Sequence, residues 1–147
     1  MSALLERLQA DLNAARKASD KPRTLLVGTI LAETKNRRIE LQRDLTDDDV
    51  VDVLRKQIKR RRESEQAFTQ GNRADLAEKE KGEAAALETY LPPSVNDDEL
   101  RTAVRAAVAG GAANIGAVMG KVMQQYKGRA DGSVINRIAR EELAAKG

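Results

Sequence analysis

Histidine, cysteine and tryptophan are all absent from this chain of 147 residues, and aromatic residues make up only 2% of it. Without histidine, the chain lacks the usual general base at neutral pH and the commonest metal ligand. Without cysteine, it lacks a disulfide, a thiolate nucleophile and a cysteine-based zinc site, which is typical of a reducing compartment. We therefore predict no catalytic, cofactor-binding or metal-binding residues.

The composition favours helices. Hydrophobic residues make up 41% and charged residues 33% of the chain, and strong helix formers such as Ala, Leu, Glu, Lys and Arg dominate it. No stretch approaches the roughly 18 apolar residues that a membrane span needs, and the first residues lack the pattern of a signal peptide. We expect an all-α protein of the cytoplasm that does not enter a membrane.

Four helices, arranged as helical hairpins, are expected in an N-terminal module of residues 1–91. The first runs to about residue 18 with Ser2 as its N-cap, and its leucines recur at spacings of three and four. The second follows Pro22, because proline is tolerated in a first helical turn. The residues expected on the inward face of this second helix are Leu25, Leu26, Ile30 and Ile39.

The third and fourth helices are predicted from a cap and a turn. Thr46 and the three aspartates that follow it are typical of a helix start, and this helix should end near Gly71. The fourth helix, from about Leu76 to Leu91, has a weaker pattern because its stripe is mostly charged. Residues 92–95 then form a linker, since two prolines cannot continue a helix.

Residues 96–147 are expected to form a small bundle of three short helices. Asn96 caps the first of them, with Glu99 three residues on, and Gly110 ends it. Asp131 is a plausible N-cap for the last. The acid clusters at residues 47–49 and 97–99 could in principle collect Mg²⁺, but both lie at expected helix starts, where carboxylates are stabilised anyway.

Six of the eight residues between positions 55 and 62 are basic, and four of them are candidates for nucleic-acid binding: Arg55, Lys56, Lys59 and Arg60. Such a cluster can supply salt-sensitive affinity for phosphates. Residues 63–95, however, carry seven acids against three bases. If that segment folds back as an antiparallel helix, it covers part of the basic face, so a solvated or internally paired face remains the other interpretation.

A second basic group lies near the glycine-containing turns of the tail: Lys121, Lys127, Arg129 and Arg137. Glycine permits close approach of a backbone to a phosphate, although these glycines can also simply make turns. The few aromatic residues are too scattered to stack bases. We therefore expect contact with the nucleic-acid backbone and its shape.

Two stretches of the tail resemble a known family. They are Gly-Ala-Val-Met-Gly-Lys-Val-Met at residues 116–123 and Lys-Gly-Arg-Ala-Asp-Gly-Ser-Val-Ile-Asn at residues 127–136. They resemble the end of the GatB/YqeY domain, and the Leu-Pro-Pro step at residues 91–93 and residues 25–36 resemble stand-alone YqeY-type proteins. The resemblance covers essentially the whole chain.

The resemblance implies an all-helical protein whose C-terminal bundle is similar to the tail of the B subunit of the tRNA-dependent Asp/Glu amidotransferase, which contacts the body of the tRNA. At the family level it implies a carbon–nitrogen ligase with glutamine as the amide donor, and as partners tRNA, amidotransferase subunits or an aminoacyl-tRNA synthetase. The catalytic parts of that enzyme have no counterpart in these 147 residues.

Three hypotheses follow. The leading one is a tRNA-binding or amidotransferase-associated module without its own active site. The second is a protein–protein interaction adaptor with no RNA role, which uses an apolar groove between the N-terminal helices and the tail. The third is an enzyme with amidase or ligase activity of its own, which nothing in the residues predicts.

Overall fold

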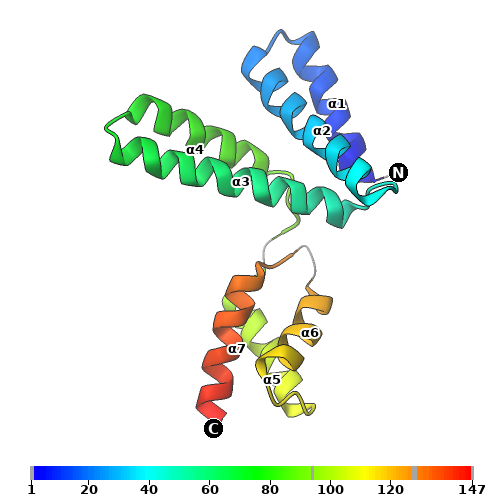
Figure 1. Ribbon diagram of the computed structural model, residues 1–147, viewed down its shortest axis with the longest axis vertical. Helices are drawn as coiled ribbons and strands as arrows, with labels where there is room; N and C mark the ends of the chain where they lie inside the picture. The colour runs from blue at the N-terminus through cyan, green and yellow to red at the C-terminus, as the bar shows by residue number, and fades with distance from the viewer. Residues whose placement is uncertain (1, 94, 127–128, 147) are drawn as a thin grey trace. The chain divides into compact units, whose positions relative to one another are not determined.

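The structure is a computed structural model, which describes residues 2–93, 95–126 and 129–146. These residues form seven helices and no strand, so the predicted all-α fold is confirmed (Figure 1). The chain divides into two compact units, Met1–Leu91 and Pro92–Gly147. Within the described ranges, no helix has the length and apolar character needed to cross a membrane.

The first unit consists of two helical hairpins (Figure 1). Helices α1 (Ala3–Lys17) and α2 (Lys21–Leu41) form one, and α3 (Asp47–Gln70) and α4 (Ala74–Glu88) form the other. The hairpins meet where α3 begins, and their far ends diverge. A hairpin is the expected arrangement because each pair is joined by only three residues.

The predicted caps at the start of α1 and α3 are confirmed. The Ser2 side chain accepts a hydrogen bond from the N–H of Leu5, and its hydroxyl donates to Asp47. Thr46 forms a complete capping box with Asp49, because each side chain accepts the backbone N–H of the other residue. Each cap satisfies donors that the first helical turn leaves open.

The core of the first unit lies at the junction of the two hairpins. Its buried members come from all four helices, the loop before α3 and the turn after α4: Leu8, Leu26, Val27, Ile30, Leu45, Val50, Leu54, Leu87 and Tyr90. Helix α3 contributes only its first half to this core. The outer half of α3, beyond Ile58, packs against α4 and forms an arm with it (Figure 1).

The prediction that Leu25 and Ile39 face inward is wrong. Their exposed fractions are 70% and 73%, whereas Leu26 and Ile30 are buried as predicted. Residues 25 and 26 differ by about 100° around a helix, so they cannot face the same neighbour. Helix α2 therefore carries two apolar stripes, of which the rest of the unit covers only one.

Helix α4 faces α3 with small side chains. The buried residues of α4 are Ala77, Ala84 and Leu87, whereas the sequence pattern gave a mostly charged stripe. Alanine at these positions lets two helices approach closely, because it leaves little side-chain bulk between them. Two of the charged residues of that stripe, Glu80 and Glu83, lie half-buried at its edge.

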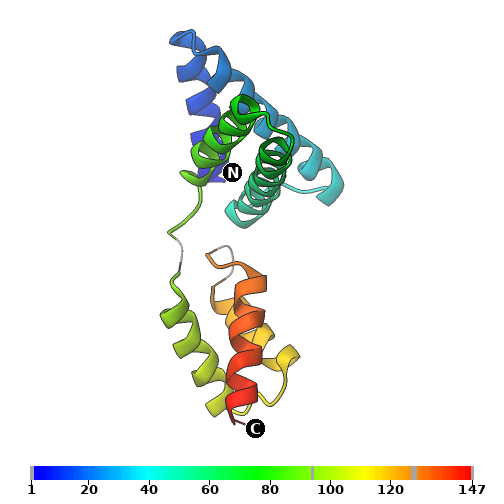
Figure 2. The ribbon, with the colours of Figure 1, turned by 90° about the vertical axis from the view of Figure 1, so that its left-hand side faces the viewer.

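The second unit contains the three predicted short helices, α5 (Asp97–Ala109), α6 (Ile115–Gln125) and α7 (Gly132–Lys146). Its core is formed by ten buried residues from the helices and the turns between them: Leu100, Val104, Ala107, Ala112, Val118, Val122, Tyr126, Ile135, Ile138 and Ala139. Helices α5 and α7 run in the same direction (Figure 2), with residues 97 and 101 bonded to residues 137 and 141.

The predicted caps of the second unit are present. Asn96 accepts the N–H of Glu99 at 2.8 Å, and Asp131 accepts the N–H of Ser133 at 2.8 Å, directly before α7. Asp131 is thus the N-cap that the sequence indicated. The neighbouring Gly128 lies outside the described residues.

Candidate nucleic-acid interface

Helix α3 carries the longer of the two basic groups, and the structure divides its cations into two classes. Arg61 belongs to the hairpin itself: its side chain is only 13% exposed and pairs with Glu83 of α4 at 3.1 Å. It also donates to the Gln57 side chain at 2.8 Å and to the Gln57 carbonyl at 3.2 Å. The pair with Glu83 joins α3 to α4, and the bonds to Gln57 fix the Arg61 side chain on α3.

Arg62 has a similar role. It pairs with Glu88 at 2.9 Å and with Glu65 at 3.1 Å, and these carboxylates raise the pKa of Arg62 above its ordinary value. Arg55, one of the four candidates on this helix, is half-buried and is also engaged in an interaction. The fold-back of the acidic segment onto part of the basic face therefore occurs as the sequence suggested.

Lys56, Lys59 and Arg60 form the other class. All three are exposed, and they fall within one arc of the helix because their spacing is three and four. Asp52 and Glu63 lie on the same face, but no carboxylate of the described residues comes within 4.0 Å of the three cations. We call these three residues the α3 cationic face.

The tail group behaves differently, because Arg137 is already paired. It donates to Asp97 at 2.8 Å and to Glu141 at 3.2 Å. These two carboxylates, Asp97 first, raise its pKa. Arg137 therefore joins α7 to the first turn of α5, and a phosphate at this position has to compete with two acids.

Of the other tail candidates, Arg129 lies at the same end of α5 as Arg137, and Lys121 lies at the opposite end. The Lys121 ammonium lies beside Gly110, 3.6 Å from the position of a Cβ there, at the negative C-terminal end of α5. Arg129 lies beyond the other end of α5, since its carbonyl accepts the N–H of Val95. The two sites are separated by the length of α5, about 20 Å for 13 residues. Lys127 lies outside the described residues.

Arg129 and the aromatic residues indicate how a ligand can be contacted. The Arg129 guanidinium lies over the Tyr126 ring at 5.7 Å, which leaves it exposed but positioned. Tyr126 and Tyr90 are themselves buried, and Phe68 is half-buried. With two of the three rings buried and the third half-buried, they form no platform for stacking bases, so the available chemistry is that of cations facing a backbone.

The acid clusters have local partners. Arg43 donates to Asp49 at 2.6 Å and, together with the Thr46 N–H, lowers the pKa of Asp49. Asp47 accepts hydrogen bonds from Ser2 and the N–H of Leu4, which lower its pKa as well. Among the described residues, no three potential ligands lie close enough together to hold a metal ion.

The sequence reasoning missed one surface. An open groove of about 610 Å³ lies between α1 and α2, within the first unit, and the exposed Leu25 lines it. The signal was present in the sequence, because Leu25, Ala32 and Ile39 recur every seven residues. The same spacing also fits a core-facing stripe, which is what the sequence pattern predicts for Leu25 and Ile39.

The chain was compared with known proteins. The profile of the family described as YqeY-like protein matches residues 5–143. A relative from Pyrenophora tritici-repentis, named altered inheritance of mitochondria protein 41, mitochondrial, is 34% identical over 151 residues, which cover 99% of this chain and 83% of the relative. Proteins of the same name from Lachancea thermotolerans and Clavispora lusitaniae are 34% and 33% identical, over 46% and 59% of their own lengths.

The predicted cytoplasmic location is wrong by this comparison, because these relatives are named as mitochondrial proteins. The prediction rested on the absence of cysteine and of a signal-peptide pattern. Neither feature distinguishes the cytosol from an organelle matrix. Both compartments are reducing, and the signal-peptide pattern concerns secretion only. The family match spans both units, and the identity extends over nearly the whole chain. The chain belongs to the YqeY-like protein family.

Proposed function

We propose that this protein is a tRNA-binding module that acts beside a tRNA-dependent amidotransferase and has no active site of its own. The α3 cationic face is the observation that carries the proposal. Lys56, Lys59 and Arg60 are exposed and free of carboxylate partners among the described residues, while the neighbouring Arg61 and Arg62 hold the hairpin together. Unpaired cations on a rigid helix suit a phosphate backbone.

The position of this face supports the proposal. Lys59 and Arg60 lie on the arm formed by α3 and α4, beyond the core of the first unit, and Lys56 lies just before it. An RNA helix can therefore approach α3 along its free side. The link to tRNA and to the amidotransferase comes from the resemblance of the tail to the B subunit of that enzyme, with amidotransferase subunits or an aminoacyl-tRNA synthetase as further partners.

Binding of bulk tRNA at several salt concentrations tests the proposal. Each phosphate contact contributes about 0.7 to 0.9 to the slope of log affinity against log salt. Replacing Lys56, Lys59 and Arg60 by Ala should therefore reduce the slope by about 2 to 3. The matched control replaces three exposed lysines of other helices, Lys17, Lys79 and Lys146, and removes the same charge.

The tail provides a second arm of the same experiment. Replacing Lys121 and Arg129 by Ala should reduce the slope by less than the α3 variant does, because the two residues lie at opposite ends of α5. The proposal fails if tRNA does not bind at low salt. It also fails if the α3 variant and its control bind alike.

A protein–protein adaptor without an RNA role is the second candidate, and the open groove beside Leu25 favours it. Recovery of partners from a lysate with and without ribonuclease separates the two functions. Partners that are lost on ribonuclease treatment support RNA binding. For the third hypothesis, an enzyme in its own right, the purified chain has to release ammonia from glutamine unaided.

A further inference from the structure

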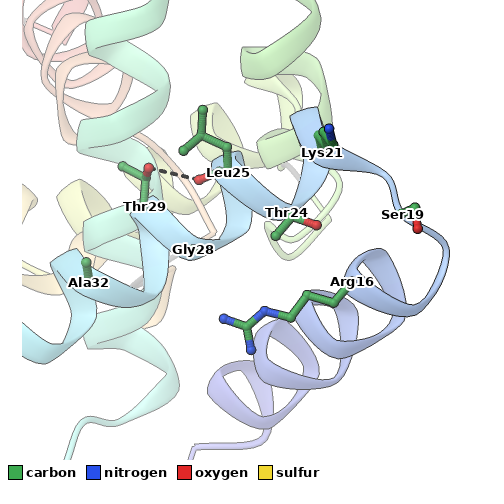
Figure 3. Close-up of a pocket in the computed structure, with 8 residues that line it drawn as sticks. All are labelled: Arg16, Ser19, Lys21, Thr24, Leu25, Gly28, Thr29 and Ala32. Atoms are coloured by element: carbon green, nitrogen blue, oxygen red, sulfur yellow. Dashed lines mark hydrogen bonds between the residues drawn. The ribbon is translucent and has the colours of Figure 1, made fainter.

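An apolar groove lies between α1 and α2, away from the α3 cationic face. Its walls come from both helices and the turn between them: Leu25, Gly28, Thr29 and Ala32 from α2, Arg16 from α1 and Ser19 from the turn (Figure 3). Leu25 is 70% exposed, although it is a large apolar residue. Exposed apolar side chains that line a groove are typical of an interaction site.

Small and internally bonded side chains make the groove apolar and shallow. The Thr29 hydroxyl donates to the Leu25 carbonyl at 2.9 Å, and the Thr24 hydroxyl donates to the Asp20 carbonyl at 2.7 Å. Both threonines are thus satisfied within their own helix. Gly28 has no atom within 4 Å of the position of a Cβ, so the surface above it is open.

The apolar stripe continues along α2 beyond the groove. Leu25, Ala32 and Ile39 are separated by seven residues each, and Ile39 is 73% exposed. A seven-residue spacing keeps side chains on nearly the same face of a helix. The stripe is about 21 Å long at 1.5 Å per residue, which matches a partner helix of roughly 14 to 16 residues.

The charge at the groove selects the partner. Arg16 reaches from α1 into the space beside Gly28 and Thr24, and Lys21 lies at the start of α2 (Figure 3). Both are exposed, and neither has a carboxylate within 4.0 Å among the described residues. Asp20, the nearest acid in sequence, accepts the N–H of Arg23 as a cap. Among the described residues, the two rim cations therefore form no ion pair.

We propose that this groove docks an amphipathic helix of a partner protein, whose apolar stripe packs on Leu25 and the open surface of Gly28 while its acidic side chains pair with Arg16 and Lys21. The helix-in-groove mode suits two antiparallel helices with small residues between them. A second copy fits poorly, because a two-fold dimer centred on the groove brings the rim cations of both copies into one interface. The proposal is independent of RNA binding by α3.

Selection of displayed helical peptides on the full chain tests the proposal. The library holds about 16 residues with a fixed apolar stripe and randomised flanks. Peptides that carry Asp or Glu on one flank should be enriched. The proposal is overturned if no peptide is enriched, or if the enriched flanks are not acidic.

Two variants locate the binding site. At Gly28 an added Cβ meets no atom within 4 Å, so Gly28→Leu covers the open surface, and Gly82→Leu makes the same change on α4, where a Cβ also meets nothing. Gly28→Leu should weaken the enriched peptides by about tenfold or more, and Gly82→Leu should leave them unchanged. Equal effects of the two variants, or none, overturn the proposal.

Charge and competing occupants are tested on the same peptides. Reversing Arg16 and Lys21 to Glu should weaken binding, whereas Lys17→Glu, an exposed neighbour outside the groove, should not. Gly28→Leu should leave the affinity for tRNA unchanged. A loss of tRNA affinity in this variant would show that RNA binds in the groove, and it overturns the proposal. Sedimentation should show a monomer. A dimer that dissociates on Leu25→Asp would mean that a second copy occupies the groove, and this result overturns the proposal.

Discussion

Arg60 and Arg61 are adjacent on α3 but belong to different classes of cation. Replacing each of them by Ala therefore compares the two classes. Arg61 is 13% exposed and bonds to Glu83 and to the buried Gln57, whereas Arg60 is exposed and has no ion pair among the described residues. Both substitutions remove one charge and gain similar helix propensity. A difference in stability therefore reports the contacts of Arg61.

The expected magnitude follows from these contacts. Arg61→Ala removes charged hydrogen bonds and leaves Gln57 without its partner, which should cost about 2 to 3 kcal/mol. This cost lies below the roughly 3 to 5 kcal/mol of a fully buried pair, because Glu83 is 27% exposed and water can solvate it. Arg60→Ala should cost less than about 0.5 kcal/mol.

The two tyrosines make an assay for the first unit alone. Tyr90 lies in the first unit and Tyr126 in the second, and the chain has no tryptophan. In a Tyr126→Phe background, near-ultraviolet circular dichroism therefore reports the first unit. Arg61→Ala should lower its melting temperature by about 8 to 24 °C. Equal melting temperatures for the Arg60 and Arg61 variants would refute the division of α3 into structural and free cations.

Three further predictions concern the first unit. Tyr90→Phe removes the hydroxyl that donates to Asp11 but keeps the buried ring, so the free energy of unfolding from urea titrations should fall by about 1 to 2 kcal/mol. Leu26→Ala should lower the free energy of unfolding by about 2 to 4 kcal/mol, and Leu25→Ala should lower it by less than about 0.5 kcal/mol. Equal losses of this free energy would contradict the exposure of Leu25. Arg43 lowers the pKa of Asp49 below its ordinary 3.8, so this carboxylate stabilises the fold above pH 3.8 and loses that effect as the pH falls further. Asp49→Asn should therefore make the urea midpoint less dependent on pH between pH 5 and the acid limit, and an unchanged pH profile would contradict the role of Asp49.

Local signals in the sequence were sufficient for the helices and their caps. Ser2, Thr46, Asn96 and Asp131 bond to N–H groups two or three residues ahead, so their roles depend on nearby residues only. The same locality explains why the all-α class could be predicted from composition and spacing.

The choice between two stripes of one helix is not local. Leu25 and Leu26 have the same chemistry, and only the positions of α1 and α3 decide which of them is covered. The pairing of Arg61 with Glu83, 22 residues away, depends on the register of the α3–α4 hairpin. The sequence could predict that acids fold back on the cluster, but the structure was needed to separate Arg61 from Arg60.

The salt dependence of tRNA affinity for the wild-type chain and the variant with Ala at Lys56, Lys59 and Arg60 tests the proposed function most directly. The account predicts binding at low salt, and a slope of log affinity against log salt that is smaller by about 2 to 3 in the variant. It predicts a smaller change for the control with Ala at Lys17, Lys79 and Lys146. Equal slopes for the three proteins would contradict it.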